Sequence, residues 1–149
     1  MPTENSNQSY FITANAKTGT ETEMKMQKNK TPHIVLGVTG SIAAYKACEI
    51  VRLCIKRGWN VSVAMTPAAE KFVTPLTFGT LSRNPVATDM FESRDFRPEH
   101  ISLADAADAF VIAPCTADVI AKAAHGIADD IVSTSFLATK APVIIASSF

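Results

Sequence analysis

The stretch HIVLGVTGSIAAYKACEIVRL, residues 33–53, passes from a short apolar segment through a glycine-containing turn straight into a helical pattern. The small and apolar residues that recur at helical spacing after the turn are Ala43, Ala47, Ile50 and Cys54. Gly58 follows where such a helix is expected to stop, because glycine readily adopts the backbone conformation that ends helices. The stretch therefore predicts a strand, a turn and a helix in direct succession.

Further along the chain, short β-rich runs alternate with helical segments. The predicted strands are residues 33–38, 60–65, 108–113 and 142–146, and the later predicted helices are residues 116–125, ended by Gly126, and 129–139. Because the strands are almost continuously hydrophobic, we expect both faces of their sheet to be covered. Strands that alternate with helices pair in parallel through right-handed crossovers. The predicted fold class is a three-layer, flavodoxin- or Rossmann-like α/β domain, with a parallel sheet between helices on both faces.

Composition limits the class of protein. With 149 residues, 47% of them hydrophobic and 19% charged, the chain has the size and composition of one soluble globular domain. Basic and acidic residues both number 14 and no basic cluster stands out, which argues against nucleic-acid binding. The longest apolar runs are too short to cross a bilayer, and the N-terminus lacks a signal-peptide pattern, so we expect no membrane association.

The two ends of the sequence differ in character. Residues 1–30 are rich in Thr, Asn, Glu, Lys and Gln and show no hydrophobic period, which predicts a disordered tail. Residues 31–149 carry the predicted domain. Its three cysteines, Cys48, Cys54 and Cys115, lack the spacing of metal ligands and cannot all pair. They indicate a reducing compartment, so we predict a cytoplasmic protein without a metal site.

In such folds, ligands bind beyond the carboxyl ends of the strands, where this sequence places small and hydroxylated residues. The residues that follow the strands are Thr39, Gly40 and Ser41, then Thr66 and Pro67, then Pro114, Cys115, Thr116 and Ala117. A phosphate at the first turn would accept hydrogen bonds from helix N–H groups and from the hydroxyl of Ser41 or Thr66. Alternatively, Ser41 and Thr116 only cap helices, which is the commoner role of each residue taken alone. The three strand ends together favour a ligand.

Neither of the two common nucleotide-binding motifs is present at the first turn. The turn GVTGSI, residues 37–42, lacks the third glycine of the dinucleotide fingerprint, and no lysine follows at the spacing of a phosphate-binding loop. A mononucleotide with one terminal phosphate is the remaining candidate.

Several segments together resemble the flavin-dependent cysteine decarboxylases, and most closely the phosphopantothenoylcysteine decarboxylase domain of coenzyme A synthesis. They are GVTGSIAAYKA (37–47), VAMTPAAEKFVTPLTF (63–78), HISLADAADAFVIAPCTADVIAKAAHGIADDIVST (100–134) and APVIIA (141–146). The resemblance covers about residues 33–146. Its third segment is specific, because a His, an Ala-Asp before a strand, a Pro-x-Thr-Ala-Asp after it and a Gly-Ile-Ala-Asp-Asp occur in order at the family's spacing.

The resemblance implies FMN bound between the subunits of a homotrimer or of an assembly of trimers. It places the phosphate on Gly40, Ser41 and Ile42, in the turn that begins with Thr39, and near Thr66. It assigns the lining of the flavin ring and ribitol to Phe72, Pro114, Cys115, Thr116 and Ala117. It assigns the catalytic histidine to His100. Independently, predicted apolar helical faces around Phe136, Leu137 and Phe78 would be exposed in a monomer, which also favours a homo-oligomer.

The implied reaction is decarboxylation of 4'-phosphopantothenoylcysteine to 4'-phosphopantetheine, in which oxidation of the substrate thiol by flavin supplies an electron sink. His100, with an ordinary pKa near roughly 6.5, would act as a base or orient the substrate. On pattern alone, a histidine at that position is more often a surface or capping residue.

After APVIIA the family continues with a Pro-x-Met-Asn segment that holds the substrate carboxylate and a flap that carries a cysteine, whereas this sequence reads Ser147, Ser148 and Phe149. We therefore expect weak substrate binding and turnover that stalls after decarboxylation, with Cys115 a packing residue and not a substitute. Two alternatives stay open. One is a non-catalytic, regulatory FMN-binding protein. The other is an enzyme similar to flavin prenyltransferases, which share the turn but not the context of His100.

Overall fold

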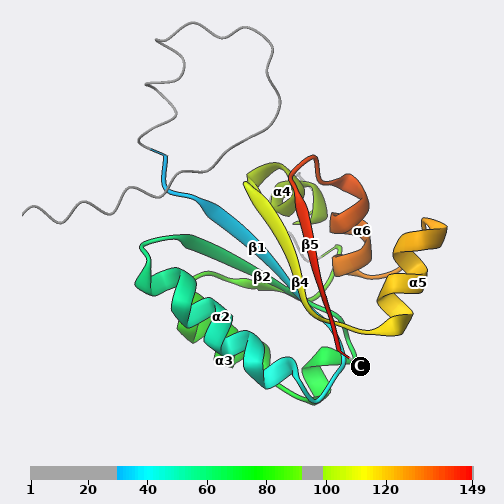
Figure 1. Cartoon of the computed structure of the whole chain (residues 1–149), viewed down its shortest axis with the longest axis horizontal. Helices are drawn as coiled ribbons and strands as arrows, with labels where there is room; N and C mark the ends of the chain where they lie inside the picture. Colours follow the sequence, from blue (N-terminus) through cyan, green and yellow to red (C-terminus); the bar gives the residue numbers. More distant parts are fainter. Residues whose placement is uncertain (1–29, 92–98, 149) are drawn as a thin grey trace, which may run out of the picture. The chain divides into compact units, whose positions relative to one another are not determined.

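The computed structural model, which describes residues 30–91 and 99–148, contains a five-stranded parallel sheet in the order β3-β2-β1-β4-β5 (Figure 1). The strands are β1 (His33–Val38), β2 (Asn60–Met65), β3 (Val86–Ala87), β4 (Ala109–Cys115) and β5 (Val143–Ser147). The tail predicted for residues 1–30 lies outside the described residues except for Lys30. The predicted bounds of β1 and β2 are confirmed, whereas β4 continues two residues beyond the prediction and β5 is shifted by one residue.

Helices cover both faces of this sheet. The described helices are α2 (Ala44–Lys56), the 3-10 turn η2 (Ala69–Lys71), α3 (Pro75–Ser82), α4 (Glu99–Ala106), α5 (Ala117–His125) and α6 (Ile131–Ala138). One buried cluster joins α2, η2 and α3 to the sheet, and a second joins α4, α5 and α6 to the opposite face. Figure 1 shows the same division. The predicted three-layer α/β fold is therefore confirmed. The longest described helix has 13 residues, and none combines the length and apolar content needed to cross a membrane.

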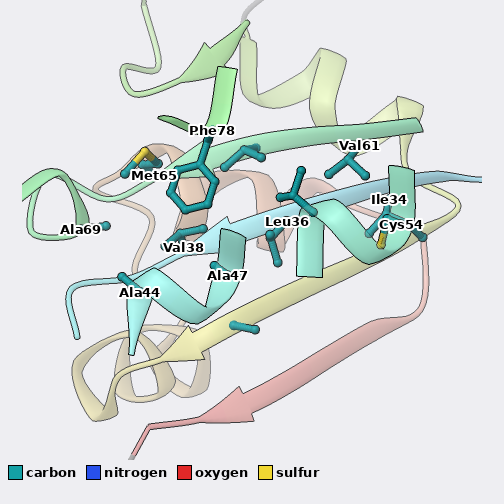
Figure 2. Close-up of a cluster of buried hydrophobic side chains, with 13 residues drawn as sticks. Ile34, Leu36, Val38, Ala44, Ala47, Cys54, Val61, Met65, Ala69 and Phe78 are labelled. Atoms are coloured by element: carbon teal, nitrogen blue, oxygen red, sulfur yellow. The ribbon is translucent and has the colours of Figure 1, made fainter. Parts of the chain in front are cut away.

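The core beneath α2 and α3 differs in two ways from the prediction. The buried residues of α2 are Ala44, Ala47, Val51 and Cys54. Ala47 and Cys54 were predicted, whereas Ala44 and Val51 are buried in place of the predicted neighbours Ala43 and Ile50. Phe78, which was expected on an exposed face, is completely buried against β1 and β2 (Figure 2). Phe136 packs against the second cluster, whereas Leu137 is exposed as predicted.

The register of the central strands brings their carboxyl ends together. β1 and β2 pair residue for residue from His33 with Asn60 to Val38 with Met65, so the two strands end level. β4 pairs with the other side of β1, where Gly37 lies opposite Ile112. The connections that follow β1, β2 and β4 therefore leave the same edge of the sheet side by side. The candidate site is formed by residues of these three connections.

Candidate functional site

A cavity of about 420 Å³ lies at the carboxyl ends of β1, β2 and β4. Its lining residues are Gly40, Thr66, Pro67, Ala68, Thr116, Asp118, Val119, Lys122, Asp129 and Asp130. Three of the predicted site residues, Gly40, Thr66 and Thr116, are thus brought together from three separate connections. The volume lies within the range of pockets that hold cofactors and other small molecules.

Gly40 is where the β1–α2 turn touches the connection that follows β2. A Cβ atom on Gly40 would lie 2.4 Å from the Cβ of Ala68 and 3.0 Å from its carbonyl carbon. A residue with a side chain would push the two connections apart. Glycine therefore permits a close approach that forms one end of the cavity.

The hydroxyl groups of Ser41 and Thr66, which lie on the connections that follow β1 and β2, each accept a hydrogen bond from a backbone N–H group. Ser41 Oγ accepts a hydrogen bond from Ala43 N–H at 3.2 Å, and Thr66 Oγ1 accepts one from Ala69 N–H at 3.2 Å. No described residue accepts a hydrogen bond from either hydroxyl, or from the N–H groups of Gly40 and Ile42. The residues thus leave four donors without an internal acceptor near the start of α2, where the helix dipole favours an anion.

Thr39 has a different role from its neighbours in the turn. It is completely buried, and its hydroxyl donates to the carbonyl of Pro114 at 2.7 Å and accepts from Thr116 N–H at 3.0 Å. Both hydrogen-bonding capacities are used inside the protein, so Thr39 ties the end of β1 to the end of β4. Its hydroxyl thus supports the turn beneath the cavity, and a contact between Thr39 and a ligand stays a prediction.

The remaining predicted residues of this site lie around the cavity in different environments. Pro114 and Cys115 are buried, and burial raises the pKa of the Cys115 thiol above its usual value. Thr116 occupies the N-cap position of α5 but makes no capping hydrogen bond with its side chain, so the capping interpretation does not hold for it. Ala117 and Phe72 are exposed. The assignment of these residues to the flavin ring and ribitol stays a prediction.

His100 lies apart from the cavity. It belongs to the first turn of α4, which Figure 1 shows beside the beginning of β4, away from the carboxyl ends of the strands. His100 does not contribute to the cavity lining. Its Nδ1 atom is buried and has no hydrogen-bond partner among residues 30–91 and 99–148. An unsatisfied buried nitrogen is costly in a folded protein and calls for a partner from outside the described chain.

The far wall of the cavity carries an ion cluster that the sequence analysis did not predict. Lys122 Nζ lies 3.3 Å from Asp118, 3.0 Å from Asp129 and 3.3 Å from Asp130. These hydrogen bonds, that to Asp129 foremost, hold the pKa of Lys122 above its usual value despite partial burial. Two signals were available in the sequence. Asp118 precedes Lys122 by four residues, and Asp130 precedes Ser133 by the three residues typical of an N-terminal helix cap.

Comparison with known proteins adds an independent line of evidence. The model of the flavoprotein family matches residues 22–148. The chain is 48% identical over 115 residues to the coenzyme A biosynthesis bifunctional protein CoaBC of Haemophilus influenzae, and 49% identical over 115 residues to CoaBC of Bacillus subtilis. Each match covers 76% of this chain but only 29% and 28% of the relative. The chain thus spans less than a third of the length of these curated relatives.

A solved structure shares the fold. The crystal structure of the FMN-dependent cysteine decarboxylase SpaF is similar with a TM-score of 0.75 and 29% sequence identity. The match covers 79% of this chain and 69% of the SpaF chain, so it extends over most of the domain that surrounds the cavity.

Proposed function

We propose that this chain, which belongs to the flavoprotein family, binds FMN in the cavity and contributes to the decarboxylation of phosphopantothenoylcysteine in coenzyme A biosynthesis. The observation that carries the proposal is a group of hydrogen-bond donors without an acceptor among the described residues, beside the close contact of Gly40 with Ala68. Coenzyme A biosynthesis follows from the name of the CoaBC relatives, the substrate from the sequence segments that resemble phosphopantothenoylcysteine decarboxylases, and the cofactor from SpaF, which is named FMN-dependent. A cytoplasmic location remains a prediction, consistent with three cysteines that are all free.

The residues at the start of α2 suit a terminal phosphate. The N–H groups of Gly40 and Ile42 and the hydroxyls of Ser41 and Thr66 provide donors, and the N-terminus of a 13-residue helix adds a favourable field. The N–H groups of Ala43 and Ala69 hold the two hydroxyl oxygens in place, and the hydroxyl protons can rotate toward the ligand. Each hydrogen bond to a charged group contributes about 1.5–3 kcal/mol to binding.

His100 is the residue that we propose to handle a proton of the substrate. Bound FMN would supply two-electron oxidation of the substrate thiol. The imidazole can accept or donate a proton through its ring nitrogens. Because His100 does not line the cavity of its own chain, we propose that it acts at the cavity of a second copy.

Exposed apolar side chains beside the cavity support this oligomeric arrangement. Ile42 and Leu76 are 74% and 78% exposed, and Tyr45 and Phe72 also expose their side chains. These residues flank the connections that form the cavity, and a monomer would leave them in contact with water. We propose a closed homotrimer, in which the cavity of one chain meets the α4 helix of the next. Sedimentation of a stable monomer at micromolar concentration with FMN bound would contradict it.

FMN binding can be tested separately from catalysis. Ser41→Ala combined with Thr66→Ala should weaken FMN binding at least tenfold in a flavin-fluorescence titration. Ser41→Asp is the sharper variant, because its carboxylate can still cap Ala43 N–H but would repel the phosphate. We expect near-normal thermal stability and loss of FMN binding. A colourless wild-type protein that takes up no FMN would refute the cofactor assignment.

Catalysis by shared sites has its own experiment. His100→Asn should abolish the anaerobic bleaching of bound FMN by 4'-phosphopantothenoylcysteine while FMN stays bound. Ser41→Asp should be inactive because it lacks FMN. If each site combines residues from two chains, refolding the two variants together should restore part of the bleaching, since some sites then pair an intact cavity with an intact His100. Absence of recovery in verified mixed oligomers would contradict the shared site. Absence of bleaching in the wild type would favour the non-catalytic alternative.

A further inference from the structure

The cavity that Gly40 and Thr66 line is also lined by an ion cluster built around one lysine, Lys122. Lys122 projects from α5 to carboxylates on its own helix and on the segment that leads into α6, and its side chain is 20% exposed. It thereby links α5 to the segment that leads into α6. The proposed function assigns no role to this cluster.

The cluster also fixes the start of α6. One carboxylate oxygen of Asp130 accepts a hydrogen bond from Ser133 N–H at 2.8 Å, and the other lies 3.3 Å from Lys122 Nζ. Ser133 Oγ in turn accepts a hydrogen bond from Asp130 N–H at 3.1 Å, which completes a capping box. Gly126, at φ 68°, ends α5 just before this segment. Lys122 therefore joins a well-defined helix end to a well-defined helix start.

The charges of the cavity are divided between its two ends. Three carboxylates around one ammonium group leave two net negative charges on the wall formed by α5 and α6, whereas the opposite end presents only N–H and O–H donors. Without Lys122 the wall would carry three negative charges. A phosphate bound at the donor end shares the cavity with this wall, so it would feel the added repulsion.

We propose that Lys122 is a positioning residue for the bound mononucleotide, because it holds the aspartate wall in place and limits the repulsion between that wall and the phosphate. The inference rests on the proposed binding of FMN in this cavity. It differs from a purely structural role in one respect. A structural role would affect any flavin equally, whereas the electrostatic role affects a flavin that carries a phosphate more than one that does not.

The test compares FMN with riboflavin, which lacks the phosphate, in titrations of flavin fluorescence at low ionic strength. Lys122→Met should weaken FMN binding about tenfold and riboflavin binding less than about threefold. Lys122→Arg should keep both affinities within about threefold, because it retains the charge. Lys56→Met, which removes an exposed lysine at the far end of α2, is the matched control and should change neither affinity.

Two further measurements make the result decisive. Combining Lys122→Met with Asp129→Asn returns the wall to two negative charges and should recover most of the FMN affinity. High salt should shrink the difference between the ligands, because it screens the added charge. Equal weakening of both ligands, unchanged binding in Lys122→Met, or no recovery in the double variant would overturn the inference. Wild-type protein that binds neither flavin would instead overturn the proposed function on which the inference rests.

Discussion

The substitution Gly40→Ala tests the contact on which the cavity depends. The added Cβ would lie 2.4 Å from the Cβ of Ala68, whereas ordinary contact begins at 3.4 Å, so the two connections would have to separate by about 1 Å. Overpacking of this kind costs about 1–3 kcal/mol of folding free energy. The same shift moves the donors at the start of α2 away from the phosphate. Loss of even one hydrogen bond to the phosphate corresponds to about tenfold weaker FMN binding.

Urea unfolding and flavin-fluorescence titration would measure the two effects of Gly40→Ala. Gly79→Ala is the matched control. It makes the same chemical change inside α3, where the nearest atoms to the new Cβ would be 3.6 and 3.7 Å away. Because alanine favours helices more than glycine does, we expect this control to gain about 0.5–1 kcal/mol and to bind FMN normally.

A second-site change identifies the cause of any loss in Gly40→Ala. Ala68→Gly removes the atom at 2.4 Å but leaves the carbonyl carbon at 3.0 Å, so it should relieve the clash in part. Gly40→Ala should therefore cost less in the presence of Ala68→Gly than alone, with a coupling above about 0.5 kcal/mol. A Gly40→Ala protein as stable as the wild type, with unchanged FMN affinity, would refute the assignment of the close contact as a structural requirement of the site.

Three further predictions concern the surroundings of the cavity. Thr39→Val should lower the free energy of unfolding by about 2–3 kcal/mol in urea, because it removes the partner of Thr116 N–H and one of the two hydrogen bonds to the Pro114 carbonyl. Thr39→Ser should restore most of the loss. Burial raises the pKa of the Cys115 thiol above its usual value of 9.0. The unfolded thiol therefore ionises at a lower pH than the folded one, so the stabilisation is complete below about pH 9 and is lost as pH rises through the folded-state pKa. Cys115→Ala should reduce this loss of unfolding free energy in urea unfolding measured between about pH 8 and 10.5. Arg83 ends α3 at φ 61°, so Arg83→Gly should stabilise the protein by about 1 kcal/mol, and an unchanged melting temperature would contradict this expectation.

The long, strongly patterned elements could be predicted from the sequence, and the short ones could not. β1 and β2 are mostly apolar runs bounded by turn residues, so both their existence and their ends were evident. β3 has two residues, too few to show a period. α3 has eight residues without a clear apolar face, and its buried residue Phe78 therefore gave no sign of its direction. Only the packing of α3 against α2 and β2 determines which side of it is buried.

The position of the candidate site could be predicted from the sequence, but the role of each residue in it could not. The rule that ligands bind beyond the carboxyl ends of parallel strands correctly brought Gly40, Thr66 and Thr116 to one cavity. The rule could not show that Thr39 turns inward, because this depends on the register between β1 and β4. It also could not show that His100 is absent from the cavity lining, which depends on where α4 packs.

The hydrogen bonds of Ser41, Thr66 and Thr39 show which of these hydroxyl groups keeps a proton that no described residue accepts. Ser41 is not the N-cap residue of α2, which is Ala43. Accepting a hydrogen bond uses a lone pair of the hydroxyl oxygen and leaves its proton free, so Ser41 and Thr66 can each hold a backbone N–H group and still donate to a phosphate. Thr39 differs because its proton already points at the carbonyl of Pro114. The useful question for a hydroxyl at a strand end is therefore whether its proton is already bound inside the protein, and here two of the three protons are available to a ligand.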